Sequence, residues 1–234
     1  MLRVTTRFVE RRPVDDDIPT AEFLLRLLSD EVERRDAKQL DTRLRKANFE
    51  HRKSLDDFDF TFNPRVPKTQ VIDLATCGFI RKHENVCIVG QAGVGKSHIA
   101  QAIGHRACLA GFDVLYTPAH KMLKDLRACR ADGTHDRRLA RYSSVDLLII
   151  IDDLGLRALT GDEPIGLHDI IRQRYERAST VITSNRGLEE WAPLFNDQLL
   201  GNAAMDRLLH HVKVIEVTGA SYRNPPSRPK KKAS

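Results

Sequence analysis

Residues 90–97 read Gly90-Gln91-Ala92-Gly93-Val94-Gly95-Lys96-Ser97, and this stretch decides the fold of the 234-residue chain. It fits G-x-x-x-x-G-K-[ST], follows an apolar run at 85–89 and opens a helix-compatible segment that reaches Ala110. In that context the glycines let successive backbone N–H groups converge on phosphate oxygens at the positive end of a helix. We expect Lys96 to reach the β- and γ-phosphates and Ser97 to bind Mg²⁺. A chance glycine turn is the alternative reading.

An acidic pair follows a second apolar run. Residues 147–151 are wholly apolar and are followed directly by Asp152 and Asp153. Because α/β sheets bind ligands at the carboxyl ends of their strands, we expect Asp152 to hold Mg²⁺. Asp153 would orient or deprotonate the attacking water. Capping of a turn by either aspartate is the plainer alternative.

A polar residue also ends the next strand, 181–184, at Asn185. An amide can donate and accept hydrogen bonds, so Asn185 could hydrogen-bond the γ-phosphate or the attacking water as a sensor. The alternative is that asparagine is present only because it suits the backbone conformation of a turn. Further along, Arg207 could reach the phosphate of a neighbouring subunit, or it could only pair with Asp206 or cap its helix. His210 and His211 have no third ligand at metal-binding spacing and are expected at the helix end.

The apolar runs predict an α/β fold built on a parallel sheet. They occur at 86–89, 114–116, 145–151, 181–183 and 212–217, with longer helix-compatible segments between them. Continuous β-branched runs indicate strands buried on both faces, as in a three-layer αβα arrangement. The strand at 114–116 lies between the phosphate loop and the acidic pair, an order that resembles the additional-strand class of P-loop ATPases.

The N-terminal region has a different character. A helix is expected over about residues 21–48, and its C-terminal part is basic, including Arg43, Arg45 and Lys46. That charge fits either a solvated helix face or a nucleic-acid contact. In the segment 55–63, Phe58 and two further phenylalanines alternate with aspartates that would repel phosphates, so a strap docked on the next domain is expected. We divide the chain into a helical region (1–60, its first 20 residues poorly ordered), an ATPase domain (61–223) and a basic, disordered tail (224–234).

Composition limits the classes of function. The hydrophobic content of 41% can build a core, and the net charge of +6 favours a polyanionic partner. No stretch approaches the roughly 20 apolar residues that span a bilayer. The four cysteines form no C-x-x-C pair, and no apolar secretory signal opens the chain, so a cytoplasmic protein with reduced thiols is expected.

Five ordered motifs together resemble the IstB-like helper ATPases of bacterial insertion sequences. They are GQAGVGKSHIAQAIG, LLIIIDDLG, VITSNR, MDRLLHHVKVIEV and GASYR, and SLDDFDF upstream matches as well. The resemblance covers about residues 21–223. The family is similar to DnaC-type helicase loaders and, more remotely, to DnaA initiators within the AAA+ class.

This resemblance implies an ATP-dependent, DNA-binding homo-oligomer that assists a transposase in capturing target DNA. It places ATP against Gly90, Gln91, Ala92, Gly93, Val94, Gly95, Lys96, Ser97 and His98. It also implies Mg²⁺ held by Ser97 and Asp152, and catalytic roles for Lys96, Asp152, Asp153, Asn185 and Arg207, the last as an arginine finger. DNA contacts would come from the N-terminal helix and from a second basic set: Lys121, Lys124, Arg127, Arg130, Arg137, Arg138 and Arg141.

The sequence departs from the family pattern at both ends. Residues 1–20 match poorly, and only 17 residues follow the final strand at 217, too few for the helical lid of most AAA+ proteins. The expected fold is therefore a lidless AAA+ domain with a short helical N-terminal region, in which Arg223 could replace a lid-borne sensor. A DnaC-like helicase loader and a non-hydrolysing DNA-binding protein remain the alternative functions.

Overall fold

The computed structural model describes residues 20–131, 133–151 and 158–223, without the side chains of residues 20 and 129–131. The chain forms two compact units, Met1–Asp41 and Thr42–Ser234. The division falls inside helix α1 (Thr20–Ala47), earlier than the sequence-based boundary at residue 60. The reason is that residues 42–60 pack with the second unit, where Ala47 and Phe58 are buried.

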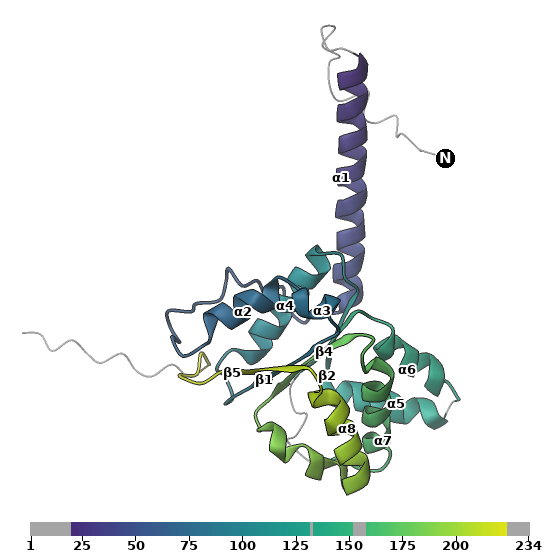
Figure 1. The fold of residues 1–234 in the computed structure, drawn as a ribbon. Helices are drawn as coiled ribbons and strands as arrows, with labels where there is room; N and C mark the ends of the chain where they lie inside the picture. Colours follow the sequence, from purple (N-terminus) through teal and green to yellow (C-terminus); the bar gives the residue numbers. More distant parts are fainter. Residues whose placement is uncertain (1–19, 132, 152–157, 224–234) are drawn as a thin grey trace, which may run out of the picture. The chain divides into compact units, whose positions relative to one another are not determined.

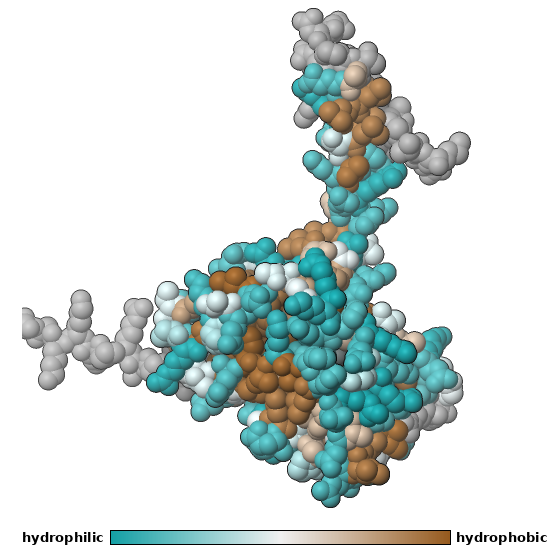
Figure 2. Space-filling view, in the orientation of Figure 1, coloured by the Kyte–Doolittle hydropathy of each residue, from teal (hydrophilic) through white to brown (hydrophobic). Residues whose placement is uncertain are grey.

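The described part of the first unit is helical. Several of its large apolar side chains are exposed, and Figure 2 shows brown patches along α1; the exposed ones are Phe23, Leu24, Leu25, Leu28 and Val32. Ion pairs one helical turn apart, such as Arg35 with Glu31 at 2.7 Å, line the same helix. Within the described residues, no helix combines the length and apolarity needed to cross a bilayer.

A five-stranded parallel sheet organises the second unit, in the order β2-β3-β4-β1-β5. The strands are β1 (Asn85–Val89), β2 (Val114–Pro118), β3 (Leu147–Ile151), β4 (Ser179–Ser184) and β5 (Val212–Glu216). Strands β2, β3 and β4 are buried along their whole length, which confirms the prediction from continuous apolar runs. Strand β4 lies between β1 and β3, so the end of β4 adjoins the loop that follows β1.

Helices cover both faces of the sheet (Figure 1). On one face lie α2 (Lys68–Ala75), α3 (Gly78–Arg81) and α4 (Lys96–Leu109). On the other lie α5 (Ala119–Ala131), α6 (His135–Ser143), α7 (Glu163–Arg174) and α8 (Gln198–Leu209), with the short 3-10 helices η2 (Leu188–Glu190) and η3 (Ala192–Phe195). Side chains alternate between the faces: Leu148 and Ile150 join the core under α5–α8. The result is the expected three-layer αβα fold, and no helix follows β5 in the described residues.

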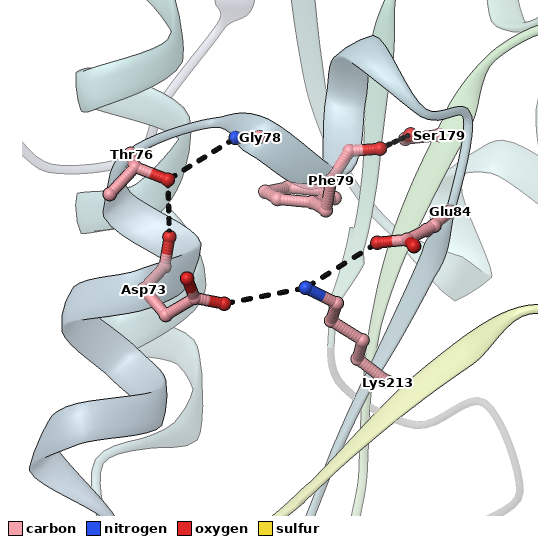
Figure 3. A network of polar contacts seen from close by, with 7 residues as sticks. All are labelled: Asp73, Thr76, Gly78, Phe79, Glu84, Ser179 and Lys213. Carbon is pink, nitrogen blue, oxygen red and sulfur yellow. Dashed lines mark hydrogen bonds and ion pairs between the residues drawn. The ribbon is translucent and has the colours of Figure 1, made fainter.

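Polar contacts secure the amino end of the sheet, as Figure 3 shows for β5 and the α2–α3 turn. The Lys213 ammonium lies 3.3 Å from Asp73 on α2 and 3.4 Å from Glu84 before β1. On β4, the Ser179 hydroxyl donates to the Phe79 carbonyl on α3. These contacts attach α2 and α3 to the strands on both sides of β1.

Arg174, at the end of α7, secures the same end of the sheet from the opposite face. Its buried guanidinium donates to the carbonyls of Tyr142, Val145 and Ser179, among others, and to the hydroxyl of Thr180. Burial lowers the pKa of Arg174, but an arginine remains charged at neutral pH. One cation thereby joins the end of α6 to the starts of β3 and β4.

Candidate nucleotide site

The phosphate loop connects β1 to α4, as the sequence predicts. Gly90 donates its N–H to the Ser184 carbonyl, and its φ is +151°. A Cβ built on Gly90 would lie only 2.0 Å from the Val217 carbonyl oxygen, so backbone from the β5 side excludes any larger residue there. Gly95, with φ of +102°, ends the loop directly before the first residue of α4. The N–H groups that open α4 therefore face the carboxyl end of the sheet, where an anion is stabilised.

Lys96 and Asn185 meet at this end of the sheet. The buried Lys96 ammonium donates to the Asn185 side-chain oxygen at 2.7 Å and to the Gln91 carbonyl at 2.7 Å. Asn185 follows β4, which pairs with β1, and this pairing brings residues 89 apart in sequence into contact. Two of the predicted site residues are thus brought together.

Aromatic side chains from both ends of the second unit pack over the loop. The Phe58 ring lies 5.2 Å from that of His98 and 5.4 Å from that of Tyr222. The backbone N–H of Tyr222 donates to the Gly93 carbonyl, and its hydroxyl donates to the Asp59 carbonyl. A cavity of about 550 Å³ remains beside the loop, within the range of small-molecule sites. Its lining includes Lys53, Asp57, Ser97, His98, Asn185 and Arg223.

Two carboxylates hold the strap, residues 55–63, in its conformation. Asp57 accepts hydrogen bonds from the Ser54 hydroxyl and N–H, and these lower the pKa of Asp57. Asp59 accepts from Thr61 and from the Phe62 N–H, which lowers the pKa of Asp59 in the same way. The expected docking of the strap onto the domain is confirmed, because Phe58 is buried against the loop.

The acidic pair lies outside the described residues. Strand β3 ends at Ile151, whose register partner Pro118 ends β2, so Asp152 and Asp153 follow the strand at its carboxyl end. Ser97, in the first turn of α4, offers a hydroxyl to the cavity. That hydroxyl fits a ligand of Mg²⁺, a cation that prefers oxygen donors.

Arg207 does not line this cavity. It lies in the last turn of α8, before the amino end of β5, whereas the phosphate loop follows the carboxyl end of β1 beside it. A five-residue strand separates these ends by roughly 15 Å. Its guanidinium donates to the Ala203 carbonyl on its own helix.

The predicted DNA-contact residues lie on three helices. On α5, Lys121, Lys124 and Arg127 share one exposed face, while Met122 and Leu126 between them are buried. On α6, Arg137 and Arg141 are exposed, and Arg138 donates to Asp125 at 2.6 Å. On α1, Arg45 and Lys46 are exposed and Arg43 is partly buried; the Arg130 side chain is outside the described set.

Sequence analysis did not predict the contact between Tyr222 and the phosphate loop. These segments are about 130 positions apart, and no local pattern links them. Lys53 also lines the cavity, and its sequence context predicted no nucleotide contact for it. The Ser221-Tyr222-Arg223 motif and the alternating phenylalanines were the available signals.

Comparison with known proteins agrees with this geometry. Residues 3–232 match the family model of the IstB-like ATP binding protein, so the expectation that residues 1–20 match this family poorly is wrong from residue 3 onward. The chain is 32% identical over 210 residues to the ATP-binding protein of insertion sequence IS232 from Bacillus thuringiensis subsp. berliner, covering 90% of this chain and 84% of that one. It is 36% identical over 202 residues to the corresponding IS21 protein of Pseudomonas aeruginosa, and the match covers 86% of this chain and 76% of that one.

The fold is also that of a known class of structures. The DnaC helicase loader superposes with a TM-score of 0.55 at 20% identity, covering 64% of this chain and 86% of that one. A match at this identity shows a shared P-loop AAA+ fold. Together with the match along nearly the whole sequence, it shows that the chain belongs to the IstB-like ATP-binding protein family.

Proposed function

We propose that this chain is an ATP-dependent DNA-binding helper of a transposase, which hydrolyses ATP to control its assembly on target DNA. The observation that supports this most directly is the contact of Lys96 with Asn185 beside the phosphate loop. A phosphate-binding cation and a polar group able to position water occupy one cavity there. Hydrolysis requires such a water-positioning group in addition to the groups that bind the phosphates.

The chain's own groups have separate tasks in this proposal. Loop N–H groups and Lys96 bind the phosphates, in a cavity whose lining includes Phe58 and Tyr222. ATP with Mg²⁺ supplies the phosphoanhydride bond; Ser97 and Asp152 would hold the cation and Asp153 would orient the water. Asn185 positions the γ-phosphate, and Arg207 of an adjacent subunit stabilises the developing charge.

DNA binding is proposed for the exposed basic faces of α5 and α6 and for the basic end of α1. Lysine and arginine in such an array contact phosphates without reading base identity. Affinity should therefore fall steeply with salt, and salt-insensitive binding would contradict this assignment. The insertion-sequence origin of the relatives supports a transposase as the protein partner.

The direct test of the nucleotide site is Lys96→Ala. This change should abolish binding of ATP, measured by calorimetry, and also DNA-stimulated hydrolysis, because the buried ammonium is the main cationic ligand of the phosphates. Lys82→Ala, at an exposed lysine outside the cavity, is the matched control and should behave as wild type. Unchanged ATP affinity in Lys96→Ala would show that the nucleotide does not bind at Lys96.

A helicase loader is the second candidate, because the DnaC helicase loader has the same fold. Copurification distinguishes the two functions. Capture of a transposase in the presence of ATP supports the first function, and capture of a replicative helicase supports the second. DNA binding without any ATP turnover would instead indicate a non-hydrolysing DNA-binding protein.

A further inference from the structure

A second cluster of ligating side chains lies at the amino end of the sheet, away from the nucleotide cavity. Glu176 is in the turn between α7 and β4, and His210 and His211 form the turn between α8 and β5. One ligand atom from each of the three lies within 4.8 Å of the other two. From this juxtaposition we propose a binding site for a divalent transition-metal ion, with Zn²⁺ the best fit.

The spacing of the three groups is close to what a small cation needs. The His210 Nδ1 lies 3.7 Å from a Glu176 carboxylate oxygen, and the two imidazole rings are 3.9 Å apart between centroids. In a tetrahedral zinc site with bonds of about 2.0–2.1 Å, ligand atoms lie about 3.4 Å apart. Small side-chain rotations would close the remaining gap, and all three side chains are exposed and able to make them.

The chemistry of the donors selects the class of cation. Imidazole nitrogens suit Zn²⁺, Cu²⁺ and Ni²⁺ better than Mg²⁺ or Ca²⁺, which prefer oxygen. Two neutral imidazoles and one carboxylate carry a charge of −1 and leave one or more coordination positions for water. The Tyr175 hydroxyl lies next to the site, 3.0 Å from His210 Nδ1. If that nitrogen bound the ion, the hydroxyl would contact water or the ion instead.

The backbone orients two of the three ligands. Glu176 and His211 both have a left-handed conformation, with φ of 56° and 57°. Each lies two residues after the end of a helix, Glu176 after α7 and His211 after α8, and an ion bound by them would join the turn before β4 to the turn before β5. The alternative is a direct contact between Glu176 and His210 that involves no metal. The experiment separates these two possibilities.

The test is titration of metal-free, untagged, full-length protein with Zn²⁺ by calorimetry in the absence of nucleotide. Absorption of bound Co²⁺ reports coordination independently. Wild type should bind one ion per chain. Even loss of an outer-shell partner costs about 10–100-fold in affinity, so Glu176→Gln and His211→Asn should weaken binding at least about tenfold. Asparagine tolerates the left-handed conformation of residue 211, which protects the fold.

His83→Asn is the matched control, since His83 is also exposed and left-handed, with φ of 56°. It should retain wild-type affinity. Absence of Zn²⁺ binding by wild type, or equal affinity in wild type and His211→Asn, would overturn the proposal, as would an equal loss in the control. No nucleotide is used, so these outcomes are separate from those that test the ATPase.

Discussion

At the scale of single residues, the contact of Lys96 with Asn185 shows how the nucleotide site satisfies its charge. A buried ammonium needs acceptors, and here an amide oxygen and a loop carbonyl supply them. A phosphate that binds Lys96 competes with the same acceptors. Asn185 therefore lies beside the cation proposed to bind phosphate, although it is not part of the phosphate loop.

Replacement of Asn185 should separate hydrolysis from binding. In Asn185→Ala, turnover should fall about 10²–10³-fold, the loss typical of removing one positioned polar group from a transition state. ATP affinity should change much less, because Lys96 and the loop N–H groups remain. Single-turnover hydrolysis and equilibrium binding measure the two quantities. A parallel loss of both would assign Asn185 to ground-state binding instead.

Arg174 illustrates a residue whose role is purely structural. Arg174→Met leaves several buried carbonyls without a donor, so we expect the free energy of unfolding to fall by about 3–5 kcal/mol. Arg172→Met, at an exposed arginine on the same helix, should change it by less than about 0.5 kcal/mol. Urea unfolding provides the measurement, and equal effects of the two changes would contradict this account.

At the scale of elements, the strap is a loop held by two carboxylates and one buried ring. The bonds that its carboxylates accept come from residues within three positions, Phe58 packs on the phosphate loop, and Tyr222 donates to the Asp59 carbonyl. A short segment of this kind has no sheet or helix to hold it. Its order therefore depends on the protonation state of Asp57 and Asp59.

Acid should loosen the strap. Both carboxyl groups have a folded pKa below the ordinary value of 3.8, so their stabilisation is complete above that pH and is lost as the pH falls through the lowered values. Wild-type stability should decline below about pH 4. In the double variant Asp57→Asn and Asp59→Asn, stability should fall less steeply below this pH, because neither side chain can be protonated. Asp56→Asn, at an exposed neighbour, should show the same decline as wild type. Urea midpoints across this range test the expectation.

Elements with local signals were predictable from the sequence, and contacts between distant segments were not. The strand, loop and helix around Gly90–Ser97 and the buried strand β3 follow from patterns within about ten residues. Helices α2 and α3 were not predicted, because short segments carry weak periodicity. Tyr222 over the loop and Glu176 beside His211 depend on the sheet order, which joins segments remote in sequence.

At the scale of the whole molecule, the position of Arg207 bears on assembly. Its helix ends at the amino end of the sheet, and the phosphate loop lies at the carboxyl end. One chain therefore does not bring its own Arg207 to its own nucleotide in the described arrangement. A neighbouring chain would have to supply it.

A mixing experiment tests this directly. Arg207→Ala alone should retain ATP binding and lose hydrolysis by about 10³-fold, the typical contribution of an arginine finger. Mixing it with the inactive Lys96→Ala variant should restore turnover. In the mixed assembly, the intact Lys96 site of one variant lies beside the intact Arg207 of the other. Arg177→Ala, at an exposed arginine, is the control. Full activity of dilute Arg207→Ala monomers, or no recovery on mixing, would contradict the role proposed for Arg207.

The separation of the two ends of the sheet also constrains symmetry. If the amino end of one sheet meets the carboxyl end of the next and the remaining two ends are left for further neighbours, the contact uses two different surfaces and is heterologous. Repetition of such a contact gives either a ring or an open helix, and each of these has a front and a back. An assembly of this kind on DNA would have a direction. In an open helix the two terminal subunits would also be chemically distinct: one would bind ATP without a finger, and the other would present a finger without a nucleotide.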